Sequence, residues 1–180
     1  LREEQWEQAA ETFRRVAAQP GVRYAAHHNL AYALERLDRL DDAAAALAQA
    51  LEHGGADDPQ VRTALGVIAL KRGDIANAEA TFAAARPQWG TRPPAASWFH
   101  YAAIAAALAG DLERALTIVT EGLTAYPHAA ALFNTLATIN ERRGDVRAAT
   151  DAANRGLHED PQLAPLHKNL GDSLYRAGRY

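Results

Sequence analysis

Seven histidines are the side chains of this sequence best suited to bind a metal or move a proton. His27 and His28 are adjacent, so on a helix they point about 100° apart and cannot easily hold one ion together. His53, His128 and His158 fall near expected helix ends, where an imidazolium suits the dipole of the helix. The spacing therefore favours surface and helix-end histidines over a metal site.

Three acids, Asp38, Asp41 and Asp42, are the nearest thing to a carboxylate cluster. They stand at an expected helix start, where acidic side chains are favoured anyway. The sequence has no glycine-rich phosphate loop, no His-Glu-x-x-His pair and no nucleophile elbow, and it has no cysteine to supply a thiolate ligand or a disulfide. We therefore expect no enzyme activity, no metal and no cofactor.

A turn signal recurs along the chain and divides it into units of similar length. Gly73, Gly110, Gly144 and Gly178 are spaced 37, 34 and 34 residues apart, and Asp38 fills the same place 35 residues before the first of them. Glycine adopts a positive φ after the last residue of a helix, and aspartate tolerates that conformation better than most residues. The first three glycines are each followed by an aspartate, which can cap the next helix. Each signal predicts a helix–turn–helix.

Prolines mark the other end of each unit, and apolar residues between the two breakers follow helical spacing. The prolines are Pro20, Pro59, Pro87, Pro127 and Pro161. Leu163, Leu166, Leu170 and Leu174 form one such stripe. The pattern predicts ten helices and no strand, at about 2–18, 22–37, 40–53, 59–72, 75–86, 94–109, 112–125, 128–143, 146–159 and 162–177.

Small residues recur at matched points, as is needed where two helices cross closely. In the first helix of each unit they are Ala31, Gly66, Ala103, Ala137 and Gly171. In the second helix they are Ala43, Ala78, Ala115 and Ala149, followed seven residues later by Ala50, Ala85, Gly122 and Gly156. Aromatic residues on the helices, namely Trp6, Phe13, Phe82, Trp98, Phe99 and Phe133, have the spacing of a core. Trp89 instead lies in a long connection with prolines on both sides, and we expect it to pack over the seam between repeats.

These features together resemble the tetratricopeptide repeat family, whose unit is about 34 residues long and has two antiparallel helices. Asn29-Leu30-Ala31 and Lys168-Asn169-Leu170-Gly171 with Tyr180 are close to the family pattern, whereas Ala102 and the long connection at 85–94 depart from it. The resemblance implies an all-α fold, a right-handed superhelical solenoid of antiparallel helix pairs. It implies a single array over 1–180, with half repeats at 1–20 and 163–180 and full repeats at 21–58, 59–94, 95–128 and 129–162.

The resemblance also implies a concave groove lined by the first helix of each repeat. The groove positions carried over by register are His28, Tyr32, Glu35, Thr63, Val67, Leu70, His100, Ile104, Ala107, Asn134, Thr138, Glu141, Lys168, Asp172 and Tyr175. The middle of this set is apolar and its ends are polar. The window that clamps chaperone tails in some family members holds His100, Ile104, Thr135, Pro165 and Asn169 here, which does not match the clamp.

The function implied is a protein–protein interaction scaffold that binds a peptide or protein segment in the groove. The alternative is a non-catalytic regulatory or substrate-recruiting array of a larger enzyme or signalling protein. Binding of nucleic acid is not expected, because the net charge is −3 and Lys168 is the one cation among the groove positions.

The remaining expectations concern the surroundings of the protein. Arginine outnumbers lysine 17 to 2, a bias typical of a high-GC, bacterial coding source. No apolar run approaches the roughly 18 residues of a membrane span, so we expect no membrane insertion and a cytoplasmic location, with the periplasm as the alternative. The first helix carries Trp6, Phe13 and Val16 and the last carries the leucine stripe, without a covering helix. These terminal helices are therefore expected to support self-association.

Overall fold

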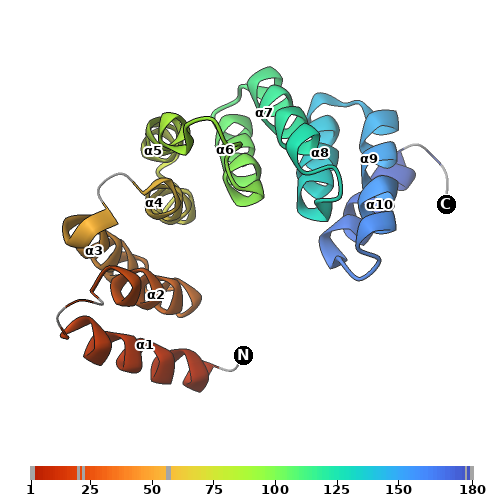
Figure 1. Ribbon diagram of the computed structural model, residues 1–180. Coiled ribbons are helices and arrows are strands. Elements are labelled where there is room, and N and C mark those ends of the chain that lie inside the picture. The colour runs from red at the N-terminus through yellow and green to blue at the C-terminus, as the bar shows by residue number, and fades with distance from the viewer. Residues whose placement is uncertain (1–2, 20, 22, 56–57, 177, 179–180) are drawn as a thin grey trace. The chain divides into compact units, whose positions relative to one another are not determined.

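The computed structural model describes residues 3–19, 21, 23–55, 58–176 and 178, and the chain divides into two compact units, Leu1–Arg92 and Pro93–Tyr180 (Figure 1). The first unit contains α1 (Glu3–Ala17), α2 (Arg23–Arg36), α3 (Leu40–Ala50), the irregular turn η1 (Leu51–Gly55), α4 (Pro59–Lys71), α5 (Ile75–Ala85) and the 3₁₀ turn η2 (Arg86–Trp89). The second contains α6 (Ala96–Leu108), α7 (Leu112–Ala125), α8 (Ala130–Arg143), α9 (Val146–Glu159) and α10 (Ala164–Arg176).

The described residues form helices and no strand, which confirms the all-α class of antiparallel helix pairs. In each unit, helices that follow one another in the chain pack side by side. The expected helix bounds agree with the observed ones to within a few residues, and α7 and α9 begin and end where the sequence places them. Pro20 and Tyr180 lie outside the described residues.

The same turn joins the two helices of a pair at several points along the chain. Gly73, Gly110 and Gly144 have φ values of 77°, 92° and 79°, and Asp38 has 59°. At each, the residue after the positive-φ position donates its backbone N–H to a carbonyl five residues back, as Asp145 does to Asn140 at 2.9 Å. That bond satisfies a carbonyl at the end of the first helix. The predicted role of the turn is confirmed, including the aspartate that replaces glycine.

The aspartates after these glycines cap the helices that follow. The side chains of Asp74, Asp111 and Asp145 accept hydrogen bonds from backbone N–H groups three residues on, at 3.2, 3.0 and 2.9 Å. Asp58 does the same for Gln60 at 2.7 Å, with Pro59 at the first position of α4. A side-chain oxygen at this position contributes typically about 1 kcal/mol to helix stability.

Small residues allow neighbouring helices to approach closely at three glycines. A Cβ built on Gly66 would lie 2.7 Å from the ring of Phe82, one on Gly122 would lie 2.7 Å from Cβ of Phe99, and one on Gly156 would lie 2.6 Å from Leu166. Each distance is too short for a real contact. These glycines therefore fix how near the helices can come.

The matched small position in α10 does not act in this way. A Cβ on Gly171 would meet no atom within 4 Å, so the described part of the chain shows no close helix crossing there. The reason is that Gly171 is exposed, with no helix packed over it in the described part of the chain.

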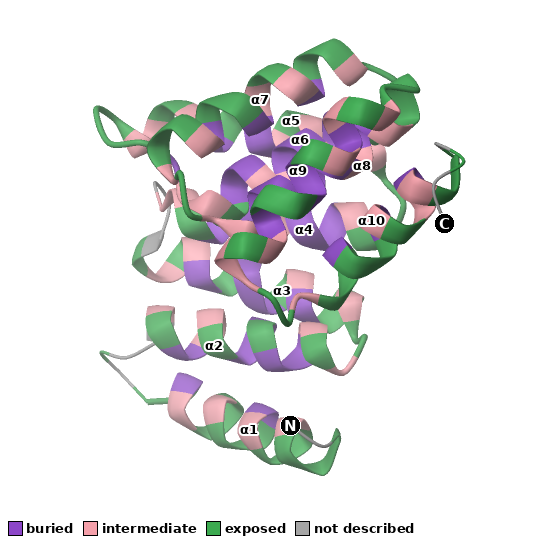
Figure 2. Cartoon of the chain, turned by 90° about the vertical axis from the view of Figure 1, so that its right-hand side faces the viewer, coloured by how far each residue is buried: buried purple, intermediate pink, exposed green. Residues whose placement is uncertain are grey.

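The cores are made where the helices of each unit face one another (Figure 2). Phe82, Trp98, Phe99 and Phe133 are buried, as expected, whereas Trp6 and Phe13 are only half-buried. Trp89 is half-buried in η2, which packs on α4 and α5.

The leucine stripe of α10 is largely used inside its own unit. Leu166 is fully buried, and Leu163 and Leu170 pack with it against Ala137 and Ala153. The expectation that the whole stripe lies uncovered is therefore wrong for Leu166. Tyr175 is the large apolar residue of α10 that is strongly exposed, with 71% of its surface accessible.

Candidate functional site

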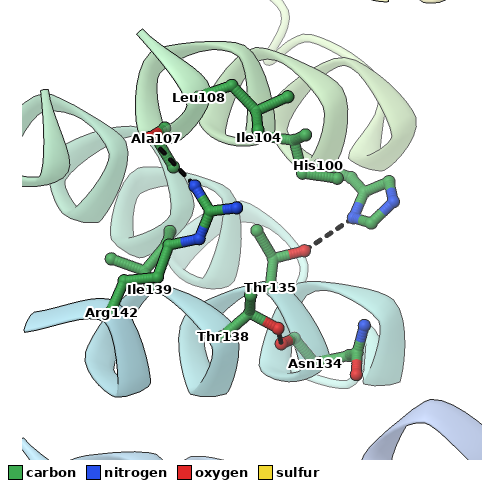
Figure 3. Close-up of a pocket in the computed structure, with 9 residues that line it drawn as sticks. All are labelled: His100, Ile104, Ala107, Leu108, Asn134, Thr135, Thr138, Ile139 and Arg142. Carbon is green, nitrogen blue, oxygen red and sulfur yellow. Dashed lines mark hydrogen bonds between the residues drawn. The ribbon is translucent and has the colours of Figure 1, made fainter. Parts of the chain in front are cut away.

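A pocket lies between α6 and α8, the first helices of two consecutive pairs in the second unit. Its volume is about 180 Å³. Its lining residues are His100, Ile104, Ala107 and Leu108 from α6 and Asn134, Thr135, Thr138, Ile139 and Arg142 from α8. Figure 3 shows the α6 side chains and the α8 side chains pointing toward one another across it.

Helical periodicity brings these residues to one face. His100, Ile104 and Leu108 are four residues apart on α6, and residues with this spacing are neighbours on a helix surface. The opposite side of α6 packs on α7, where Phe99 meets Gly122, so the lining face is held toward α8. The sequence of α6 contains no aspartate, glutamate, lysine or arginine, so this wall of the pocket carries no fixed charge.

His100 and Thr135 form one of the polar contacts between the two walls. Nδ1 of His100 lies 2.6 Å from Oγ1 of Thr135, and that hydroxyl donates to the carbonyl of Ala131 at 2.9 Å. The hydroxyl of Thr135 has one proton, and the carbonyl of Ala131 engages it. The hydroxyl oxygen therefore accepts from Nδ1–H of His100, and Nε2 is the ring nitrogen that remains as an acceptor. Burial lowers the pKa of His100, which favours this neutral imidazole.

Arg142 closes the other end of the pocket. Its Nη1 donates to the carbonyl of Ala107 at 3.1 Å, near the C-terminal end of α6. No carboxylate in the described part of the chain pairs with Arg142, whereas Arg143 next to it pairs with Glu113 at 2.9 Å. The pocket therefore combines apolar walls with a guanidinium at its edge.

Asn169 ties α10 to the same face of α8. Its Nδ2 donates to Oδ1 of Asn134 at 3.0 Å and to Oγ1 of Thr138 at 3.1 Å. Asn169 is buried, so these bonds are shielded from water. They engage the side-chain oxygen of Asn134, which leaves the amide N–H groups of Asn134 as the donors available at the edge of the pocket.

Three other expected groove residues of α8 and α10 are charged, namely Glu141, Lys168 and Asp172. Nζ of Lys168 lies 2.5 Å from Oδ2 of Asp172 on the same helix. The hydrogen bond and charge of Asp172 raise the pKa of Lys168. Glu141 is half-buried, and its Oε1 has no hydrogen-bond partner among the described residues.

The expected groove residues of the first unit lie on α2 and α4. Glu35 and Lys71 form an ion pair at 2.6 Å that joins the two helices, and His28 stacks on Tyr24. Tyr32 is 54% exposed and contacts Trp6 edge to face. Thr63 and Val67 are buried and Leu70 is half-buried, so Thr63 and Val67 offer little surface to a ligand.

The structure thus brings five of the expected groove residues into one pocket, namely His100, Ile104, Ala107, Asn134 and Thr138. The expected groove set did not include Thr135, Leu108, Ile139 and Arg142, although Thr135 stood in the clamp window. Arg142 falls eight residues after Asn134, so extending the i, i+4 series by one more turn would have found it.

The described residues give no sign of a metal site or a membrane span. No group of three or more His, Cys, Asp or Glu side chains among them is placed to share an ion. None of the helices that the structure describes combines the length and the apolar character needed to cross a bilayer.

Comparison with known proteins gives consistent results for family and fold. A family model described as a tetratricopeptide repeat matches residues 1–60, 28–96 and 63–130. No curated protein matches the chain in sequence. The solved structures with a similar fold include TTC0263, a thermophilic tetratricopeptide repeat protein from Thermus thermophilus, with a TM-score of 0.80 and 16% identity over 96% of this chain and 92% of that one.

Two further structures show the range of ligands recorded on this fold. YrrB, described as having an unusual peptide-binding site, gives a TM-score of 0.67 and 16% identity over 94% of this chain and 86% of that one. Human IFIT1, a dimer with m7Gppp-AAAA, gives a TM-score of 0.79 and 18% identity over 97% of this chain and 43% of that one. At these identities the likeness establishes the fold alone.

Proposed function

Because the chain belongs to the tetratricopeptide repeat family, we propose that it is a protein-interaction scaffold that holds a peptide or protein segment against the first helices of its repeats. The observation that carries this proposal is the pocket between α6 and α8. It offers apolar walls for one anchoring side chain and a few polar groups at its edge, which is how most small binding sites are built.

Several groups in this pocket suit a segment of polypeptide. A peptide presents both N–H donors and carbonyl acceptors, and the pocket edge presents both kinds of partner. Nε2 of His100 accepts, and the amide N–H groups of Asn134 donate. Ile104 lines the same pocket and would contact the anchoring side chain. The peptide-binding site named for YrrB shows that this fold serves such a role elsewhere.

A nucleic acid is the ligand class that the charges favour less. Binding to phosphates depends on cations that are free to replace counterions. Lys168 is paired with Asp172 and Lys71 with Glu35, so these lysines are already neutralised. Capped RNA, the kind of ligand that the human IFIT1 structure contains, therefore serves as the competing ligand in the test below and is not our leading proposal.

Selection from a display library of random twelve-residue peptides tests the proposal. The chain is immobilised, and enriched peptides are synthesised and their affinity is measured by fluorescence anisotropy. Ile104→Glu should abolish binding, because it places a charge inside the apolar pocket. Thr120→Glu, which adds the same charge at an exposed position of α7, should bind as the parent does.

Thermal unfolding of both variants separates lost binding from lost folding. If the parent chain enriches no peptide but binds capped RNA at physiological salt, the proposed function is wrong. If Ile104→Glu binds the same peptides with equal affinity, the peptide site lies elsewhere on the chain.

A further inference from the structure

We propose that the pocket between α6 and α8 selects a segment that carries one aliphatic or aromatic side chain and a carboxylate close to it in sequence. The inference rests on the proposed function and names the chemistry of the partner. Two observations carry it: an apolar cavity large enough for one such side chain, and an arginine at its edge that no described carboxylate neutralises.

The cavity has the size of a single large apolar side chain. Its volume is about 180 Å³, and a cavity of about 150 Å³ in another protein binds benzene. Ile104, Ala107, Leu108 and Ile139 supply its apolar walls. Leu108 is 46% exposed, so the cavity opens to solvent beside it and a segment can enter there.

Among the described residues around the cavity, no carboxylate pairs with Arg142. The α6 wall has no charged residue, and the other polar groups of the lining, His100, Asn134, Thr135 and Thr138, are neutral when His100 is unprotonated. Farther along the same face, Lys168 and Asp172 neutralise one another. The half-buried Glu141 is next to Arg142 in sequence but forms no ion pair with it. A carboxylate on the ligand would complement this guanidinium.

The geometry of Arg142 suits a carboxylate better than a single acceptor. A guanidinium has five N–H donors in a planar fork, and the carbonyl of Ala107 engages one nitrogen, Nη1. That bond holds the side chain over the end of α6 and reduces the entropy lost when a ligand pairs with the remaining donors. A carboxylate can then accept two parallel hydrogen bonds, an arrangement that lysine cannot reproduce.

A helix-end role for Arg142 is the competing explanation. A cation beside the last carbonyls of α6 stabilises that helix whether or not a ligand binds. This role predicts a change in thermal stability when Arg142 is replaced, but no dependence of binding on an acid in the peptide. The two roles are therefore separable by varying the peptide while the protein is left unchanged.

The spacing between the two groups on the ligand follows from its conformation. In an extended segment, side chains two residues apart lie on the same side, whereas in a helical segment the neighbours are three or four residues apart. We therefore expect the selected peptides to share an apolar residue and an acid that lies two, or three to four, residues away from it. A spacing of two would indicate an extended bound segment, and a spacing of three or four would indicate a helical one.

The experiment starts from the same random twelve-residue library, selected on the parent chain and on Arg142→Glu. The parent chain should enrich an apolar residue with Asp or Glu nearby, and Arg142→Glu should enrich Lys or Arg in place of the acid. A peptide enriched by the parent is then made with Asp→Asn and Asp→Lys changes. Its affinity for the unaltered chain should fall by at least about tenfold, and the loss should shrink as salt is raised.

A double-mutant cycle links the peptide acid to Arg142. With Arg142→Gln the Asp→Asn change should have almost no further effect, and Arg142→Lys should restore only part of the affinity. Equal enrichment of uncharged or basic peptides by the parent chain, or additive effects in the cycle, would overturn the inference while leaving the scaffold role intact. No enrichment of any peptide would instead count against the proposed function itself. A dimer that forms through this pocket and is lost in Arg142→Gln would assign the pocket to a second copy of the chain and would also overturn the inference.

Discussion

At the scale of single residues, the burial of His100 couples the stability of the second unit to pH. The pKa of His100 is lowered in the folded chain because burial disfavours the imidazolium. The unfolded chain, with an ordinary pKa of about 6.5, therefore binds a proton more readily than the folded one. The stabilising contribution is present above pH 6.5 and is lost as the pH falls through the folded pKa.

We expect the free energy of unfolding to decrease more steeply below pH 6.5 in the parent chain than in His100→Gln. Urea unfolding at pH 7.5, 6.5 and 5.5 measures the two slopes, and their difference isolates His100 from the other histidines. Parallel curves would show that protonation of His100 costs the folded state nothing.

Gly110 tests the turn between α6 and α7 at the same scale. Its φ is 92°, and a Cβ there would meet no atom within 4 Å, so the penalty for a side chain is conformational and not steric crowding. Gly110→Val should cost at least about 1 kcal/mol, because a β-branched residue resists positive φ. Gly110→Asn should cost less, since asparagine tolerates this region. Melting temperatures of the two variants provide the comparison, and equal values would contradict this account of the turn.

At the scale of helices, Gly122 fixes the distance between α6 and α7, whereas Gly171 sets no such limit on α10. A Cβ on Gly122 would lie 2.7 Å from Cβ and 2.8 Å from Cγ of Phe99, atoms too close to the backbone to move easily. Gly171 has the same helical environment without such neighbours. A substitution at Gly171 therefore reports helix propensity alone, whereas a substitution at Gly122 reports helix packing as well.

Gly122→Ala and Gly171→Ala should consequently change stability in opposite directions. Alanine gains roughly 1 kcal/mol over glycine in a helix interior, and at Gly171 this gain should appear almost undiminished. At Gly122 overpacking costs about 1–3 kcal/mol and outweighs that gain. Denaturant unfolding of both variants measures the signs, and stabilisation by Gly122→Ala would show that α6 and α7 are less tightly packed than these distances indicate.

At the scale of the whole molecule, self-association through the terminal helices stays a prediction. Tyr175 is the residue of α10 that we expect to contribute most to such a contact. Tyr175 is 71% exposed on α10, whereas Leu166 on the same helix is fully buried. Burial of an exposed aromatic residue between two chains would favour association by roughly 25 cal/mol per Å², reduced by the entropy of association.

Sedimentation at micromolar to millimolar concentration should therefore detect oligomers that Tyr175→Glu weakens. Thr120→Glu, at an exposed position of α7, is the control and should leave association unchanged. A monomer throughout this range would contradict the prediction, and an oligomer that Tyr175→Glu leaves unchanged would place the contact away from Tyr175.

The sequence by itself determined what depends on local conformation. Glycine or aspartate at positive φ and an aspartate cap act within a few residues, so the turns at Asp38, Gly73, Gly110 and Gly144 and the bounds of α7 and α9 follow from residue types and spacing. The face of α6 that carries His100 and Ile104 follows in the same way from helical periodicity.

Only the tertiary structure decided what depends on distances between helices. The i, i+4, i+7 register places Glu141 on the groove face of α8, but the next residue, Arg142, is the one whose side chain reaches the end of α6 and closes the pocket. Periodicity likewise gives Gly156 and Gly171 equal standing, yet a Cβ on Gly156 would collide with Leu166 and one on Gly171 would touch nothing. Such differences arise from side chains of separate helices that share one volume, and the spacing of residues along a single helix does not contain that information.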